Sequence, residues 1–176
     1  MATQILIAPG FRGSGEDHWQ TYWEKENRDY IRIEQRDWNQ PVASEWVETI
    51  EKYVSESKGD VVIVAHSLAC IAVVLWAQKT RLIIKGALLV APPNINDDKL
   101  NKVLSGFAPV PQQTLPFKSI VLASTNDEYA GIEESECFAR QWGSSFFNIG
   151  AKGHINGLSN LKNWPEGKEY LLRLLS

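Results

Sequence analysis

The chain has 176 residues, a formal net charge of -3 and 44% hydrophobic residues, a composition typical of one ordinary globular domain. This slightly acidic balance implies no basic face, which makes nucleic acid and anionic membranes poor candidate partners. Two cysteines, Cys70 and Cys137, cannot build a disulfide framework, and no apolar run suits a signal peptide or a membrane helix, so we expect a cytoplasmic protein.

Short apolar runs alternate with longer amphipathic stretches along the chain. Their patterns predict strands at residues 4–8, 30–33, 61–65, 85–90, 119–123 and 146–149. They predict helices at residues 17–27, 42–57, 68–79, 97–105, 133–142 and 168–175. Because strands that alternate with helices pair in parallel, we predict one α/β domain over residues 1–176, with a six-stranded, mostly parallel sheet and helices on both faces.

Residues 91–118 depart from this alternation. They hold five of the eight prolines and only one short predicted helix. A long segment with little regular structure is often functional. Since this one follows a central strand, it could overhang a site at the carboxyl edge of the sheet, or it could be an irregular crossover.

The run VVIVAHSLAC at residues 61–70 places a serine, Ser67, where a buried strand turns into a helix. A nucleophile elbow has this arrangement and needs small residues two positions before and after the serine. Here those neighbours are Ala65 and Ala69 rather than the usual glycines. The motif predicts a nucleophile, although a serine N-cap on a core helix is the alternative interpretation.

The turn around this serine also suggests an anion-binding site. The first backbone N–H groups of a helix lack intrahelical partners and carry partial positive charge. The N–H of Leu68 would therefore face an oxyanion that forms on a substrate carbonyl. The loop after the first strand, PGFRGSG at residues 9–15, is expected to supply the second donor, from Phe11 or Arg12.

A serine hydroxyl needs a base, and the chain has three histidines. His66 adjoins the serine and is expected to point away from it. His154 lies in a glycine-rich loop directly after the last predicted strand, and Asp127 follows the strand before it. The order Ser67, Asp127, His154 is that of the α/β-hydrolase triad, although Glu128 remains an alternative acid.

The remaining candidate residues lie near the first loop. Arg12, His18 and Trp19 are candidates for substrate contacts, although His18 could instead anchor that loop and the aromatic residues of the first helix could be core. No metal motif is present, and the glycines at residues 10–15 do not match the dinucleotide fingerprint G-x-G-x-x-G. We therefore expect neither a metal nor a cofactor.

The motifs together resemble one family. They are Pro9-Gly10, Gly13-Ser14-Gly15, His18-Trp19-Gln20 with Trp23, Asp37-Trp38 with Pro41, Ala65-His66-Ser67, Ala91-Pro92, Ser124 to Asp127, Gly153 to Asn156, and Trp164-Pro165. The chain is similar over nearly its whole length to the bacterial branch (YdeN-like) of the small serine hydrolases related to retinoblastoma-binding protein nine. The resemblance implies a single α/β-hydrolase domain without a cap, a Ser67–Asp127–His154 triad, and hydrolysis of small esters or amides.

One property of that family is not expected here. Its name comes from an L-x-C-x-E pattern that binds retinoblastoma protein. The nearest match, LACIA at residues 68–72, lacks the acid and lies in a helix expected to be buried. The sequence thus predicts a serine hydrolase of small acyl substrates, with two alternatives: a binding protein that kept the fold without turnover, and an acyltransferase or thioesterase that uses the same triad.

Overall fold

The computed structural model describes residues 3–96 and 104–176, and these residues form a six-stranded sheet. The strands are β1 (Gln4–Ala8), β2 (Ile31–Arg32), β3 (Val61–His66), β4 (Gly86–Val90), β5 (Lys118–Ala123) and β6 (Ser145–Asn148). Their order is β2-β1-β3-β4-β5-β6, and every neighbouring pair is parallel. The predicted fold class is confirmed, and the sheet is parallel throughout rather than mostly parallel.

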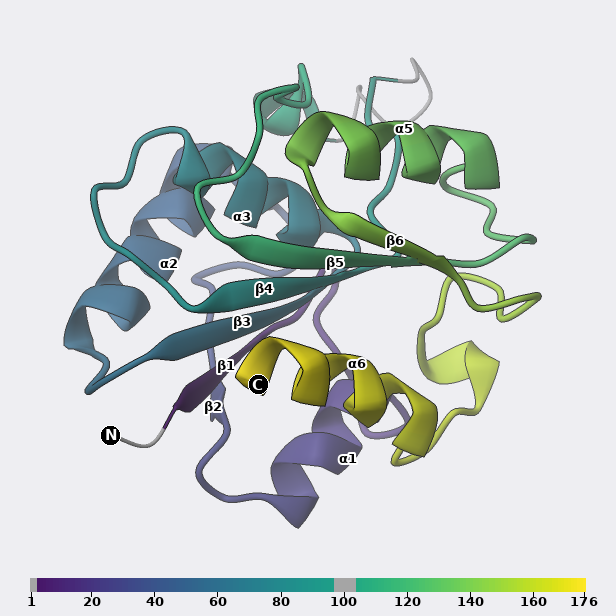
Figure 1. Ribbon diagram of the computed structural model, residues 1–176, viewed down its shortest axis with the longest axis horizontal. Helices are drawn as coiled ribbons and strands as arrows, with labels where there is room; N and C mark the ends of the chain where they lie inside the picture. The colour runs from purple at the N-terminus through teal and green to yellow at the C-terminus, as the bar shows by residue number, and fades with distance from the viewer. Residues whose placement is uncertain (1–2, 97–103) are drawn as a thin grey trace.

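Helices cover both faces of this sheet (Figure 1). They are α1 (Trp19–Glu26), α2 (Ala43–Glu56), α3 (Leu68–Ala77), α5 (Ile132–Trp142) and α6 (Pro165–Leu175), with 3-10 turns at Ser105–Phe107 and Gly157–Ser159. Figure 1 shows α1 and α6 on one face and α2, α3 and α5 on the other. Among the described residues, no helix has both the length and the apolar character needed to cross a bilayer.

Most predicted boundaries hold to within two residues, and the starts of α1 and α6 have local causes. Helix α1 starts at Trp19 because the side chain of His18 caps it, accepting a hydrogen bond from the Gln20 N–H. Helix α6 starts three residues earlier than predicted because Pro165, with its fixed φ and missing N–H, fits the first helical turn. The predicted helix at residues 97–105 lies almost wholly outside the described residues.

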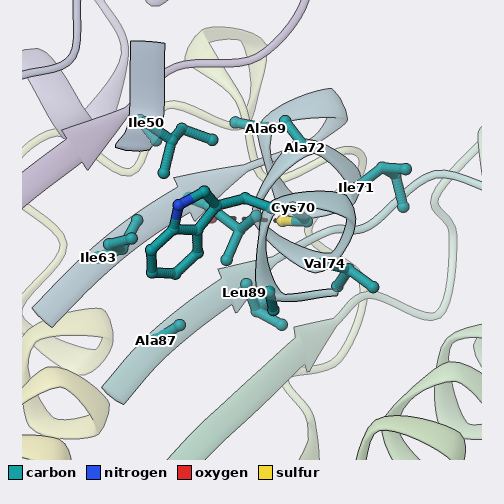
Figure 2. Packing of buried hydrophobic residues seen from close by; sticks show 14 of the residues in the cluster. Ile50, Ile63, Ala69, Cys70, Ile71, Ala72, Val74, Ala87 and Leu89 are labelled. Atoms are coloured by element: carbon teal, nitrogen blue, oxygen red, sulfur yellow. Dashed lines mark hydrogen bonds between the residues drawn. The ribbon is translucent and has the colours of Figure 1, made fainter. Parts of the chain in front are cut away.

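The sheet separates two hydrophobic clusters. Strands β3 and β4 are buried along their whole length, which explains their unbroken apolar sequences. Helix α3 is almost entirely apolar and packs against strand residues such as Ile63, Ala87 and Leu89 and against Ile50 of α2 (Figure 2). On the opposite face, Trp19 and Trp23 of α1 pack with Trp164. The start of α3 is therefore held rigidly against the sheet.

The connections define where a ligand site is expected. From β1 the chain moves to β2 on one side, and then to β3 on the other side of β1. Crevices form at such a switch point, beyond the carboxyl ends of the two diverging strands. The loop after β1 and the turn after β3 meet there.

Candidate active site

Ser67 lies in a strained turn between β3 and α3. Its φ of 53° and ψ of -125° fall in a region that non-glycine residues rarely adopt. Its N–H donates to the carbonyl of Val90 at the end of β4, which fixes the turn to the sheet. Gly10, after β1, lies so close that an added Cβ would be 2.8 Å from both the His66 carbonyl oxygen and the Ser67 Cβ. The glycine therefore allows the loop after β1 to pack directly against the elbow.

The backbone around this contact offers two N–H groups. Leu68 is the first residue of α3, and neither its N–H nor that of Phe11 has a hydrogen-bond acceptor within the described parts of the chain. The N–H of Arg12 donates to the carbonyl of Trp38 over 2.8 Å and is not available. Because the Gly10 Cβ position is only 3.3 Å from the Leu68 nitrogen, the loop after β1 passes beside the free Leu68 amide. Of the two candidates in that loop, the geometry favours Phe11.

Three side chains from separate loops are joined by hydrogen bonds. The Nε2 atom of His154 is 2.7 Å from the Ser67 Oγ. Its Nδ1 atom is 2.9 and 3.0 Å from the two carboxylate oxygens of Asp127. The side chains of His154 and Asp127 are 8% and 4% exposed, so the pair is largely shielded from water. Glu128 is exposed on the same loop, and it is Asp127 that contacts the imidazole.

The loops that carry Asp127 and His154 are bound to each other. Asn126 accepts hydrogen bonds from the Ser124 hydroxyl and from the Gly153 N–H. The Ser124 hydroxyl oxygen in turn accepts from the Lys152 N–H. Neither Ser124 nor Asn126 was predicted to have a role, although their position immediately before Asp127 is a usable signal. These hydrogen bonds hold the loop of Asp127 and the loop of His154 at a fixed spacing.

The other two histidines lie close to His154, and His66 packs against both of the other rings. His66 packs edge-on against His18 with ring centroids 4.6 Å apart, and its ring is 5.0 Å from that of His154. Burial lowers the pKa of His18 to about 3, with further contributions from the positive charge of Arg32 and from His154. Burial, followed by the neighbouring His18 and His154, lowers the pKa of His66 well below its usual value. Both rings are therefore neutral at physiological pH.

A cavity of about 600 Å³ opens over Ser67 and His154. Phe11, Arg12 and His18 line it, which agrees with three of the candidate positions proposed from sequence. Pro93 and Leu104 also line it, so described residues of the 91–118 segment form part of the wall. The aromatic ring of Tyr129 packs edge-on against His154 at 4.5 Å and forms another part. Apolar atoms thus make up most of the lining of the cavity as a whole.

The prediction that Trp19 contacts substrate is wrong. Trp19 is fully buried, and its indole N–H donates to the carbonyl of Ile155 over 2.8 Å. Its ring packs between Trp23 and Trp164 in the core. Residue His18 turns toward the cavity because it precedes the helix, whereas Trp19 lies on the helix face that packs on the sheet. Through its hydrogen bond to Ile155, Trp19 helps to hold the loop that carries His154.

Within residues 3–96 and 104–176 no cluster of three or more His, Cys, Asp or Glu side chains is arranged to hold a metal ion. Around Ser67 the structure places an imidazole in hydrogen-bond contact with the hydroxyl, and a carboxylate in contact with that imidazole. The profile of the family described as serine hydrolase matches residues 5–173. The chain belongs to this family.

Solved structures share the fold of this chain. A YdeN-like hydrolase from Pectobacterium atrosepticum is 27% identical, with a TM-score of 0.88 and coverage of 98% of this chain and 90% of that one. The ydeN gene product of B. subtilis, at 19% identity, has a TM-score of 0.80 and covers 99% of both chains. Est1E of Butyrivibrio proteoclasticus with ferulic acid bound shares the fold at 15% identity, a TM-score of 0.74, and coverage of 97% and 89%. No curated protein sequence gives a significant match. The chain is a hydrolase with the α/β-hydrolase fold.

Proposed function

We propose that this hydrolase cleaves small carboxylic esters or amides through a Ser67–His154–Asp127 triad and an acyl-enzyme. The observation that carries the proposal is the continuous hydrogen-bonded chain from the Ser67 hydroxyl through the His154 imidazole to the Asp127 carboxylate. The strained elbow supports it, because a serine held at φ 53° projects its hydroxyl away from the helix it precedes.

The proposed reaction follows from the contacts. The Ser67 Oγ attacks the substrate carbonyl while His154 Nε2 takes its proton. Asp127 accepts a hydrogen bond from His154 Nδ1, which fixes the reactive tautomer and stabilises the imidazolium that forms. The N–H groups of Leu68 and Phe11 donate to the tetrahedral oxyanion. His154 then protonates the leaving alcohol or amine, and a water molecule releases the acyl group by the same steps.

The cavity sets the size of substrate. A volume of about 600 Å³ lies in the middle of the range for small-molecule sites, and its walls at Phe11, Leu104 and Tyr129 suit an apolar acyl or leaving group. No cofactor is required by the proposed steps. The proposed partner is therefore a small acyl compound.

A fluorophosphonate probe tests the nucleophile, because it phosphonylates only an activated serine. We expect the wild-type protein to be labelled with one probe per chain, and Ser67→Ala to remain folded and unlabelled. Labelling that persists in Ser67→Ala, or no labelling of folded wild type, would overturn the proposal. A panel of p-nitrophenyl esters of graded chain length then measures the acyl preference, and the addition of competing alcohols, amines or thiols distinguishes hydrolysis from acyl transfer.

A further inference from the structure

All three histidines of the chain meet at one place, although the proposed triad uses only one of them. His66 is the residue immediately before the proposed nucleophile. It is 5% exposed and lies at the end of β3, where it pairs in register with Val90 of β4. Its ring packs against those of both His18 and His154. A buried polar side chain in this position needs a hydrogen-bond partner.

That partner is the main chain of the proposed base. The His66 Nε2 atom is 2.9 Å from the carbonyl oxygen of His154. A carbonyl only accepts, so the proton of the neutral imidazole must lie on Nε2. The same reasoning applies to His18, whose Nδ1 accepts from the Gln20 N–H and whose proton therefore lies on Nε2. The direction of the His66–His154 bond is thus fixed by chemistry.

This bond ties an irregular loop to a rigid strand. His154 lies between β6 and the 3-10 turn at Gly157–Ser159, with left-handed backbone at both Gly153 and Ile155. By contrast, β3 is a central strand bonded to β1 and β4 along its length. His154 is therefore attached to the elbow twice: through its own imidazole to Ser67, and through its carbonyl to the residue before Ser67.

We infer that His66 is a positioning residue that holds the main chain of His154 at the distance from Ser67 which proton transfer requires. The inference rests on the proposed function for its kinetic part. Proton transfer between heavy atoms 2.7 Å apart is sensitive to small shifts, and a displacement of about 1 Å in a positioned group can lower a rate about 100-fold. The side chain itself does not bond to Ser67 and exchanges no proton with substrate.

Two variants separate the hydrogen bond from simple packing. His66→Leu replaces the imidazole with a somewhat smaller apolar side chain and removes the donor. His66→Gln keeps an N–H donor at about the position of Nε2. We expect kcat of His66→Leu to fall about 10- to 100-fold with KM changed less than threefold, and His66→Gln to keep kcat within about threefold of wild type. Active sites are counted by fluorophosphonate titration, so that only folded protein enters the comparison.

Amide hydrogen exchange gives a readout independent of activity. We expect exchange of residues 150–157 to accelerate in His66→Leu and to stay at the wild-type rate in His66→Gln, because only the leucine variant releases the loop. If the wild-type protein proves to have no hydrolase activity, the proposed function fails while the exchange experiment still tests the tether. If His66→Leu does not fold, His66→Asn replaces it, since its shorter amide does not reach the carbonyl.

The outcomes are distinct. A donor-free variant with kcat within threefold of wild type and unchanged exchange overturns the inference. So does a His66→Gln variant as slow as His66→Leu, because rescue by a retained N–H is what a hydrogen-bonding role requires and a purely steric role does not.

Discussion

The buried neutral histidine at the start of α1 makes the protein sensitive to acid. His18 is 5% exposed, and its pKa is lowered to about 3 from an ordinary 6.5. Below pH 6.5, His18 is therefore protonated in the unfolded chain but remains neutral in the folded chain. The free energy of unfolding is therefore unaffected by His18 above pH 6.5, and it decreases as the pH falls from 6.5 toward 3. The loss is about 1.4 kcal/mol for each pH unit below 6.5, or about 2 kcal/mol at pH 5.0.

The variant His18→Asn isolates this effect. Asparagine is a favourable N-cap whose side-chain oxygen can accept the Gln20 N–H, and it does not titrate in this range. Whatever the substitution costs in packing is the same at every pH, so only the slope differs. We expect the free energy of unfolding to fall by about 2 kcal/mol more in wild type than in His18→Asn between pH 7.5 and 5.0.

Urea denaturation at several pH values, followed by tryptophan fluorescence, measures this difference. With a slope of about 2 kcal/mol per molar urea, the midpoint of wild type should fall by about 1 M more than that of His18→Asn over that interval. Burial is the largest cause of the lowered pKa of His66 and is common to both proteins, so the difference in slope between them reports mainly on His18. If the two proteins lose stability in parallel between pH 7.5 and 5.0, His18 is not held neutral by the fold and the reasoning from its burial is refuted.

Three further predictions address the elbow, the acid and the thiols. Gly10→Ala should lower the rate of fluorophosphonate labelling at least tenfold and destabilise the protein by about 1–3 kcal/mol, because the added Cβ would lie 2.8 Å from a backbone oxygen. Gly15→Ala in the same loop is the control. Its added Cβ would have no atom within 4 Å, so the free energy of unfolding should change by less than about 0.5 kcal/mol. Asp127→Asn should lower kcat about 10⁴-fold with little change in KM, because an amide favours the wrong tautomer of the imidazole. Steady-state ester hydrolysis measures this change. A loss of less than tenfold would exclude Asp127 as the orienting acid. Burial raises the pKa of the Cys70 thiol, so Ellman's reagent should react with at most one thiol, that of the partly exposed Cys137, in native protein and with two after denaturation.

The order of the helices and strands could be predicted because local sequence patterns determine it. Continuous β-branched runs such as residues 61–64 are typical of strands buried on both faces, as in a parallel sheet. The alternation of such runs with amphipathic stretches then leaves few topologies open. Ser67, Asp127 and His154 were predicted as a set because each follows a strand and parallel strands place their carboxyl ends on one edge. The sequence alone therefore determined the fold class and the three residues that meet above it.

The tertiary structure decided which distant groups form hydrogen bonds and which way side chains point, because both depend on several segments of the chain at once. The preference for Phe11 over Arg12 as the proposed oxyanion donor depends on the Trp38 carbonyl, which already accepts a hydrogen bond from the Arg12 N–H, and no local pattern encodes that contact. Trp19 and His18 are adjacent in the chain, yet one is core and the other lines the cavity, because the helix begins between them. The bond from His66 to the carbonyl of His154 joins residues 88 positions apart. Local propensity specifies elements, whereas such contacts arise only when packing brings distant loops to one edge of the sheet.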